Sequence, residues 1–345
     1  MRISLSIRPR LAAAPWRAHT FTAGFMQSRS YSDDRGINGS IKINENSIAN
    51  PDMSQKSGDG SAAGAFEPLS RTSAVASRRH WLVDKNAIVT GGSRGIGEAI
   101  AIRLAQEGVR CTVVGRDEWA LKNVVKRLDY WYEQGLHGGP APKRSPIRML
   151  DGASPNVHSY VVGDVRDEDL WPGLFKDKNI SILVNAAGVQ HTAFLSRTDP
   201  VDMRRVIGTN VYGTLLASRE AMVGWLANRG MDRVIINISS LLAFRGGIGA
   251  ASYAASKASV VAATRALADE GKSRGIRANV IVPGYIETDM TDTIQEPHRS
   301  RLTSRIPAGR FGYPAEVADA AMFLINNKYA NNCVLNLDGG LSATG

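Results

Sequence analysis

Several features that mark other classes of protein are scarce in this chain of 345 residues. Two cysteines, Cys111 and Cys333, are too few for a disulfide framework and too far apart for a metal knuckle. We therefore expect packing roles for both, no metal site and a reducing compartment. No run of about 18 apolar residues occurs, so no membrane span is predicted. With 43% hydrophobic and 21% charged residues, the chain can bury a globular core.

Acidic residues and lysine are absent from residues 1–32, which carry Arg2, Arg8, Arg10, Arg17 and Arg29. Because half of the net charge of +10 resides there, we do not interpret that charge as a nucleic-acid signal. An arginine-rich, serine-containing segment without acids is typical of a mitochondrial transit peptide, which predicts the mitochondrial matrix. The alternative is an ordinary tail, since Pro9 and Pro15 interrupt any amphipathic helix.

Hydrophobic periodicity is absent from residues 33–80, which are predicted to form a disordered linker. From residue 81 to 345, short apolar runs alternate with helical patterns. This alternation predicts one doubly wound, Rossmann-like α/β domain, with a parallel sheet of about seven strands and helices on both faces. The predicted strands lie within 87–90, 110–115, 158–162, 180–188, 233–240, 276–284 and 334–340. Residues 132–156, rich in Pro and Gly, are predicted to be a surface insertion.

A glycine-rich loop, "TGGSRGIG" from Thr90 to Gly97, lies directly between a predicted strand and a predicted helix. Glycines at 91, 95 and 97 let the backbone turn sharply and approach a diphosphate, which the amides of the following helix stabilise. The spacing differs from the usual G-x-G-x-x-G, so a turn without a ligand remains the alternative for this loop alone.

Arginine, rather than a carboxylate, follows the second predicted strand, in "CTVVGRD". An arginine at this place accommodates a ribose 2′-phosphate, whereas an acid accepts from the free hydroxyl. We therefore predict NADP(H), held by Arg116, with Arg94 converging on the same phosphate. In the alternative, the neighbouring Asp117 contacts the ribose and NAD(H) is preferred.

Tyr253 and Lys257, in "YAASKAS", are spaced to share one face of a helix. A phenol can donate a proton to a ketone being reduced if its pKa, near 10, falls toward the operating pH. An ammonium about 5 Å away, at an effective dielectric of about 20, would favour the phenolate by about 3 kcal/mol. We therefore predict that Lys257 lowers the pKa of Tyr253 by about 2 units.

Seven motifs, in this order, carry a resemblance to a known family: "TGGSRGIG", "GDV" (163–165), "NAAG" (185–188), "GTNVYGT", "NISS" (237–240), "YAASK" and "PGYIETDM". The sequence resembles the short-chain dehydrogenase/reductase family over residues 85–345. Within it, "PGYIETDMT", "RIPAGRFGYPAEVA" and the closing "LDGG" look most like 3-oxoacyl-[acyl-carrier-protein] reductases, including the mitochondrial carbonyl-reductase type.

The resemblance implies a function: NADPH-dependent reduction of a 3-oxoacyl group on acyl carrier protein, in fatty acid biosynthesis. A general reductase of carbonyls, quinones or hydroxysteroids is the first alternative. A non-catalytic NADPH-binding subunit of a hetero-oligomer is the second. Family members are commonly tetramers, so a homotetramer is expected, with a hetero-oligomer left open.

Catalytic roles also follow from the resemblance. Tyr253 would donate the proton, and Lys257 would also hold the nicotinamide ribose. Ser240 would stabilise charge on the substrate oxygen, with Ser239 as the competing candidate. Asn210 matches an asparagine that distorts its helix and places a water in a proton relay to Lys257.

Cofactor contacts are expected at the carboxyl ends of the predicted strands. The resemblance implies adenine near Asp164 and Val165, and the nicotinamide near the "PGYIET" segment. Together with the two catalytic residues Tyr253 and Lys257, the expected contacts are Gly91, Ser93, Arg94, Gly95, Ile96, Gly97, Arg116, Asp164, Val165, Asn185, Ala186, Gly188, Pro283, Gly284, Ile286 and Thr288.

Two further surfaces are predicted. Residues 289–312 contain few large apolar residues and are expected to form a mobile lid over the substrate. Lys272, Arg274 and Arg277 are expected to form a basic rim that steers acidic carrier protein, and Arg274 resembles the docking position of the family.

Overall fold

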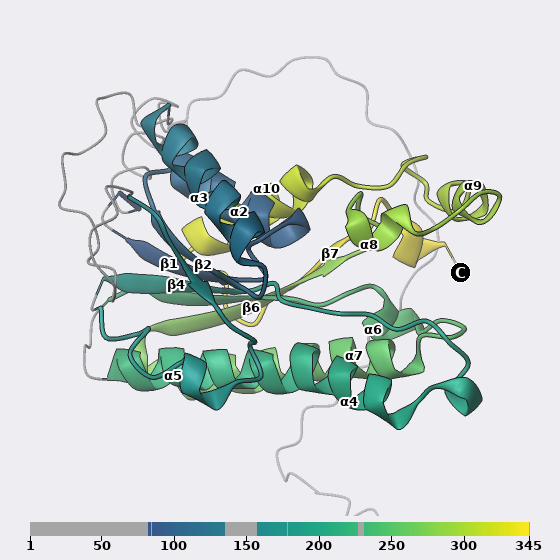
Figure 1. The fold of residues 1–345 in the computed structure, drawn as a ribbon, viewed down its shortest axis with the longest axis horizontal. Helices are drawn as coiled ribbons and strands as arrows, with labels where there is room; N and C mark the ends of the chain where they lie inside the picture. The colour runs from purple at the N-terminus through teal and green to yellow at the C-terminus, as the bar shows by residue number, and fades with distance from the viewer. Residues whose placement is uncertain (1–81, 84, 135–156, 178, 227–230, 345) are drawn as a thin grey trace, which may run out of the picture. The chain divides into compact units, whose positions relative to one another are not determined.

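The computed structural model describes residues 82–83, 85–134, 157–177, 179–226 and 231–344. All of them fall within one compact unit, residues 66–345 (Figure 1). The predicted transit peptide, the predicted linker and residues 135–156 of the predicted insertion lie outside the described residues. Among those that are described, no helix is both long and apolar enough to cross a membrane.

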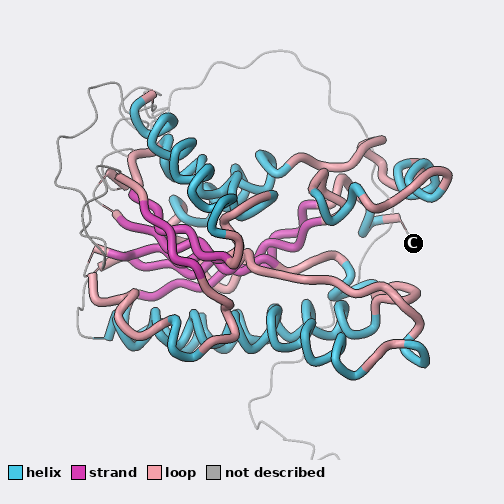
Figure 2. Tube along the Cα trace, in the orientation of Figure 1, coloured by secondary structure: helices cyan, strands magenta, loops and turns pink. Residues whose placement is uncertain are grey.

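Seven parallel strands form one sheet in the order β3-β2-β1-β4-β5-β6-β7 (Figure 2). Every residue of β1, β4, β5 and β6 is buried, which suits parallel strands covered on both faces and explains their runs of Val and Ile. The prediction of a parallel sheet of about seven strands is confirmed. The strands are β1 (Asn86–Thr90), β2 (Arg110–Gly115), β3 (Ser159–Val162), β4 (Ile180–Asn185), β5 (Arg233–Ile238), β6 (Ile276–Pro283) and β7 (Val334–Leu337).

Helices cover both faces of the sheet, as Figure 1 shows. One layer contains α2 (Gly95–Gln106), α3 (Glu118–Glu133) and α10 (Pro314–Asn326), and its buried side chains pack with those of the sheet into one apolar cluster. The other layer contains α4 (Pro200–Ile207), α5 (Gly213–Leu226) and α7 (Ala251–Gly271), with a second cluster beneath it. The doubly wound fold is therefore confirmed.

The boundary predicted for the insertion is wrong by two residues. Tyr132 and Glu133 belong to α3, and Tyr132 is buried in the core cluster of that layer. Helix α3 continues this far because Leu121, Val124, Val125 and Leu128 keep the same face apolar up to Tyr132.

The predicted lid contains α8 (Asp289–Asp292) and α9 (His298–Thr303). It has a small apolar cluster of its own, in which Leu302, Ile306 and Phe311 are buried. The ring of Phe311 stacks on Tyr285 at 5.2 Å, and Arg299 lies 4.4 Å from the centre of the Phe311 ring. The segment therefore packs more extensively than its composition suggested.

Strand order reverses beside β1, which places the ligand site. The chain passes from β1 to β2 and β3 on one side of the sheet, and then returns to β4 on the other side of β1. In open α/β sheets, ligands bind beyond the carboxyl ends of the strands at such a reversal.

Candidate active site

A cleft of about 300 Å³ opens beyond the carboxyl ends of the strands. Loops that follow β1, β2, β3, β4, β5 and β6 all contribute to its lining. Of the predicted site residues, all except Asn185 and Asn210 line it: Gly91, Ser93, Arg94, Gly95, Ile96, Gly97, Arg116, Asp164, Val165, Ala186, Gly188, Ser240, Tyr253, Lys257, Pro283, Gly284, Ile286 and Thr288. The structure thus brings together residues that are up to 197 positions apart in the chain.

The glycine-rich loop is packed too closely to carry side chains at two of its glycines. A Cβ on Gly91 would lie 2.7 Å from the Cα of Ala187, and Gly91 has φ +64°, a conformation that favours glycine. A Cβ on Gly97 would lie 2.3 Å from the carbonyl oxygen of Gly91. Glycine at these two positions therefore lets the loop pack against the segment after β4 at the start of α2.

The end of the cleft next to β2 holds Arg116, Asp117 and Asp164. The amide of Ala120 donates to Asp117 Oδ1 at 3.0 Å, so this carboxylate caps α3. Arg166 donates to both carboxylate oxygens of Asp164, at 3.0 and 2.8 Å. This pairing, with a smaller contribution from the charge of Arg116, lowers the pKa of Asp164.

Arg94 lines the cleft, as does Arg116, and it is ion-paired in the structure. Its Nη1 donates to Asp289 Oδ2 at 3.3 Å, and both side chains are more than two thirds exposed. Asp289 is the first residue of α8, so this ion pair connects the glycine-rich loop with the predicted lid. From the opposite rim, Gln190 Nε2 donates to the carbonyl of Met290 at 3.2 Å.

Tyr253 and Lys257 lie one turn apart at the start of α7. Lys257 falls on the buried face of this helix, together with Ser256, Val260 and Val261. Its Nζ lies 5.7 Å from the centre of the Tyr253 ring and donates to the carbonyl of Ile238 at 2.9 Å. The predicted side-by-side placement of phenol and ammonium is present.

The predicted direction of the Tyr253 pKa shift is wrong. Burial raises the pKa of Tyr253 to about 12, against the opposing effect of a hydrogen bond with Ser240. Burial also lowers the pKa of Lys257, to about 8. The sequence argument counted the attraction between the two charges but omitted the cost of removing each from water, which dominates here.

The two neighbouring serines have different surroundings. Ser239 Oγ donates to the carbonyl of Lys257 at 2.8 Å, which ties β5 to α7. Ser240 Oγ accepts from the amide of Leu242 at 3.3 Å and is hydrogen-bonded to Tyr253. Ser240 is therefore the one placed to act with the phenol.

Asn210 lies behind the cleft, in a π-helical segment, Gly208–Tyr212, between α4 and α5. Its Oδ1 accepts from the amide of Val189 at 2.8 Å, and its Nδ2 donates to the Val189 carbonyl and to Ser256 Oγ, both at 2.9 Å. The side chain thus holds the loop after β4 against α7. A Cβ on Gly188 would lie 3.3 Å from Lys257 Nζ and 3.5 Å from Asn210 Oδ1.

The side chain of Asn185 does not reach the cleft, contrary to its predicted cofactor contact. It is buried between the sheet and α5, where Nδ2 donates to Asn237 Oδ1 at 2.9 Å and Ser218 Oγ at 3.1 Å. Strand alternation explains this, because Asn185 is the last residue of β4 and its side chain points into the interior.

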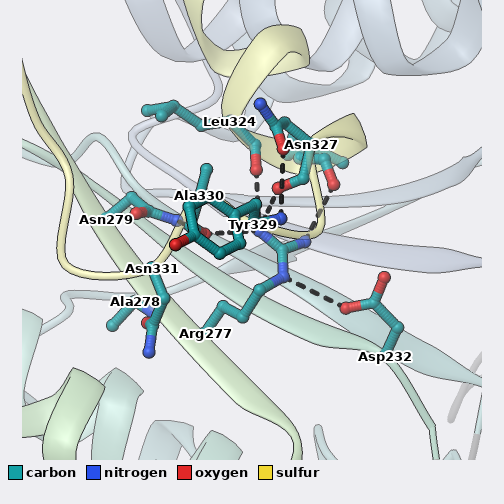
Figure 3. A network of polar contacts seen from close by, with 10 residues as sticks. Asp232, Arg277, Ala278, Asn279, Leu324, Asn327, Tyr329, Ala330 and Asn331 are labelled. Carbon is teal, nitrogen blue, oxygen red and sulfur yellow. Dashed lines mark hydrogen bonds and ion pairs between the residues drawn. The ribbon is translucent and has the colours of Figure 1, made fainter. Parts of the chain in front are cut away.

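The predicted basic rim is not confirmed for Arg277, which is buried. It lies at the start of β6, at the amino-terminal end of the strand, whereas the cleft lies beyond the carboxyl ends of the strands. Its guanidinium donates to the carbonyls of Leu324, Ile325, Asn327 and Ala330 at 2.8–3.2 Å and to Asp232 at 3.2 Å (Figure 3). Arg277 therefore caps the C-terminal end of α10.

Lys272 and Arg274 follow the C-terminal end of α7, whereas Tyr253 lies in its first turn. At 1.5 Å per residue, the helix separates them by about 27 Å. Within one chain, a partner bound at Arg274 would stand at the far end of the helix from the phenol.

Sequence reasoning missed several residues that line the cleft. The first turn of α8 contributes Asp289, Met290 and Thr291, and the loop after β4 contributes Val189. The sequence could have indicated these α8 residues, because "DMT" directly follows Thr288, a predicted cofactor contact. No group of three or more His, Cys, Asp or Glu side chains is placed to hold a metal within the described parts of the chain.

The parallel sheet, the strand reversal and the Ser-Tyr-Lys cleft define an α/β oxidoreductase of the dinucleotide-binding type. Residues 85–136 match the short chain dehydrogenase family, and residues 147–342 match the related family described as enoyl-(acyl carrier protein) reductase. The chain belongs to the short-chain dehydrogenase/reductase family of oxidoreductases.

Individual relatives cover most of the chain. A 3-oxoacyl-[acyl-carrier-protein] reductase from Rattus norvegicus is 36% identical over 76% of this chain and 100% of its own length. Carbonyl reductase family member 4 from Danio rerio is 36% identical over 74% of this chain and 97% of its own. A crystal structure from Beutenbergia cavernae, of a candidate NAD(P)-dependent gluconate 5-dehydrogenase with bound NADP, has a TM-score of 0.66 and 31% identity. It covers 76% of this chain and 98% of its own.

Proposed function

We propose that this protein reduces the ketone of a 3-oxoacyl group, carried as a thioester on acyl carrier protein, to the 3-hydroxyacyl form with NADPH. The observation that carries the proposal is the meeting of Ser240, Tyr253 and Lys257 in one cleft floored by glycine-rich backbone. The names of the curated relatives, matched over nearly their whole length, support the substrate class. Such a reaction belongs to fatty acid biosynthesis.

The residues of the cleft fit a dinucleotide. Gly91 and Gly97 allow the close packing of the loop, and its backbone amides at the N-terminal end of α2 are proposed to bind the diphosphate. Gly188 places no side chain against Lys257 Nζ, which is proposed to hold the nicotinamide ribose. Asp164 and Val165 lie where the adenine is proposed, and Pro283, Gly284, Ile286 and Thr288 lie where the nicotinamide is proposed.

Two observations support NADP(H) over NAD(H). Arg116 is exposed at the end of the cleft next to β2, where a cation can pair with a 2′-phosphate. The carboxylate of Asp117 already accepts from the first turn of α3, which leaves it less available to a ribose hydroxyl. The NADP bound in the Beutenbergia cavernae structure is a third support.

In the proposed mechanism, the bound cofactor supplies the hydride and Tyr253 supplies the proton. A phenol with a pKa of about 12 is protonated throughout the physiological range, so a proton is always available. When Tyr253 donates it to the carbonyl oxygen, the remaining phenolate is stabilised by the ammonium of Lys257, 5.7 Å from the ring. Lys257 thus acts on the product of proton transfer.

Ser240 and Asn210 have supporting roles in this proposal. The Ser240 hydroxyl, already bonded to Tyr253, orients the substrate carbonyl and donates to its oxygen as negative charge develops. Asn210 fixes Val189 and α7 relative to each other, and the space between its Oδ1 and Lys257 Nζ is where the proposed relay water belongs.

The test is an assay of the full chain with NADPH on acetoacetyl-carrier protein and on a panel of free ketones. We expect kcat/KM for the carrier-linked ketone to exceed that for every free ketone by at least about ten-fold, because the carrier adds its own binding surface. Equal rates would favour a reductase of free carbonyls, the reading that the Danio rerio relative's name supports. NADPH binding without turnover of any ketone would indicate a non-catalytic subunit.

Localisation and assembly are also proposed. Residues 1–32 are proposed to target the mitochondrial matrix, and a fluorescent fusion of residues 1–40 that stayed in the cytosol would contradict this. A homotetramer is supported by exposed small residues along α7, which allow close helix packing: Ala251, Ala255, Ala258, Ser259 and Ala262. Analytical ultracentrifugation measures the number of chains.

A further inference from the structure

Four large apolar side chains are exposed at the substrate end of the protein. The exposed fractions are 60% for Phe194, 57% for Leu195, 54% for Phe244 and 87% for Ile248. These four residues are called the apolar rim below. They lie on two chain segments, 189–198 and 240–250, that are far apart in the sequence.

The two segments are bonded to each other. The amide of Ala193 donates to the carbonyl of Gly249 at 3.0 Å, and a Cβ on Gly249 would lie 3.5 Å from the Ala193 backbone. In Figure 1, α6 (Leu242–Arg245) and the chain leading into α4 reach the same end of the molecule. The apolar rim is therefore assembled from neighbouring stretches of backbone.

Local hydrogen bonds hold both stretches in place. The carbonyl of Phe194 accepts from the amide of Arg197 at 2.8 Å, and Thr198 Oγ1 also donates to it at 3.1 Å. On the other segment, the amide of Phe244 donates to the carbonyl of Leu241 at 3.0 Å. The backbone that carries the rim is thus held by hydrogen bonds, and the rim side chains are exposed on this ordered backbone.

Both segments lead directly out of the reaction centre. The first starts at Val189, which lines the cleft and is held by Asn210. The second connects Ser240 to Tyr253, the two residues that contact the substrate oxygen in the proposed mechanism. On α8, Asp289, Met290 and Thr291 also line the cleft. The four rim residues lie outside the lining of the cleft, on the two segments that continue from it.

We infer that the apolar rim binds the alkyl chain of the substrate, so that the protein prefers 3-oxoacyl thioesters of medium or long chain to acetoacetyl thioester. This inference rests on the proposed function. A 3-oxoacyl thioester has an apolar alkyl chain on one side of the reacting ketone and a polar thioester on the other. The alkyl chain matches the apolar rim, and acetoacetyl, with one methyl group beyond the ketone, is too short to use it. Exposed apolar groups gathered next to a reaction centre are typical of ligand-binding surfaces.

The experiment measures kcat/KM of the full chain for 3-oxo thioesters of four, six, eight, ten and twelve carbons, all on the same small thiol so that carrier binding does not contribute. Burying one methylene favours binding by up to about four-fold, and a half-exposed surface gives about two-fold. We expect kcat/KM to rise by two- to four-fold per added methylene until the rim is covered. A series that is flat from four to twelve carbons would overturn the inference.

Substitutions in the apolar rim test whether the rim causes the dependence of kcat/KM on chain length. Phe194→Ser and Ile248→Ser should each lower kcat/KM for the ten-carbon thioester at least about five-fold more than for acetoacetyl thioester, which flattens the series. Tyr329→Ser is the matched control, because Tyr329 is 97% exposed beside the Arg277 network, away from the cleft. It should leave the series unchanged. An equally steep series in the two rim variants would contradict the inference.

A binding measurement separates this inference from the proposed function. Calorimetry with NADP and 3-hydroxyacyl thioesters of the same lengths should show the same gain per methylene, whether or not the ketones are turned over. Binding that strengthens with length without turnover would refute the proposed reaction alone. If the rim variants change the oligomeric mass and leave the length dependence intact, a second copy of the chain covers the rim and the inference fails.

Discussion

At the scale of single residues, the proton donor depends on one hydroxyl. Replacing Tyr253 with Phe removes only that hydroxyl and keeps the ring beside Lys257. Because a positioned general acid contributes about 10²–10⁴-fold, we expect kcat to fall by at least about 10³-fold. NADPH binding, measured by the fluorescence of the cofactor, should change less than two-fold. Turnover within ten-fold of the unmodified enzyme would refute the assignment.

The adjacent serines allow a matched comparison. Ser240→Ala removes the group that bonds Tyr253, and we expect kcat to fall by about 10²–10³-fold, as for loss of an oxyanion donor. Ser239→Ala removes the bond to the Lys257 carbonyl, which costs about 1 kcal/mol of stability but leaves kcat within about three-fold. Steady-state kinetics and urea unfolding of both variants test this. The reverse pattern would make Ser239 the catalytic serine.

The pH dependence of reduction should report Lys257. Burial lowers its pKa to about 8, so the ammonium is present below that pH and lost above it. If this charge stabilises the phenolate, kcat/KM for reduction should be level below pH 8 and fall ten-fold per unit above it. Lys257→Met should be slow at every pH, with no fall near 8. A wild-type profile that rises through pH 8 would contradict the proposed role.

Whether a residue-level feature could be predicted depends on how far apart in the sequence the interacting residues lie. The Tyr253–Lys257 spacing fixes a shared helix face, so their proximity followed from the sequence. The pKa of Tyr253 depends on burial by segments far away in the chain, which no local pattern reveals. Asn185 shows the same limit, because its partners Ser218 and Asn237 lie 33 and 52 positions away.

At the scale of elements, a buried arginine from β6 caps the C-terminal end of α10. Arg277 donates from three nitrogens to four carbonyls and Asp232, a pattern that needs the planar guanidinium fork. We expect Arg277→Met to lower the free energy of unfolding by about 3–5 kcal/mol, because it leaves Asp232 and several carbonyls without a partner.

Arg277→Lys should recover only part of that loss, since one ammonium cannot reach all of these acceptors. Arg274→Met is the control, and should change stability by less than about 0.5 kcal/mol because Arg274 lies outside this network. Urea unfolding measures all three. An Arg277→Met protein as stable as the control would show that the network contributes little.

The boundaries of the strands could be predicted from the sequence where a short apolar run gives way to a helical pattern. All seven strands were located within a few residues, because runs of Val and Ile between helical patterns have few alternatives. The role of Arg277 could not be predicted. From composition, an arginine between Ile276 and Ala278 resembles a surface charge. Only the packing of α10 and the chain after it against β6 surrounds this arginine with carbonyls.

At the scale of the whole molecule, the cleft joins both halves of the sheet. Its lining comes from loops after six strands, so a ligand that binds there stabilises the folded chain as a unit. Binding to the folded state alone raises its stability by about 2.7 kcal/mol at a ligand concentration of one hundred times Kd. The thermal midpoint therefore reports cofactor preference without requiring turnover.

We expect NADPH to raise the thermal midpoint of the full chain by several degrees more than NADH at the same concentration, because Arg116 pairs with the 2′-phosphate. In Arg116→Ala, the gain with NADPH should fall to the level of NADH, whereas Lys126→Ala, an exposed cation on α3 outside the cleft, should keep the difference. A larger gain with NADH in the unmodified chain would mean that Asp117 leaves its helix cap and accepts from the ribose hydroxyl. The same scan in higher salt should narrow the difference, because screening weakens an exposed guanidinium–phosphate pair far more than contacts to the buried backbone of the glycine-rich loop.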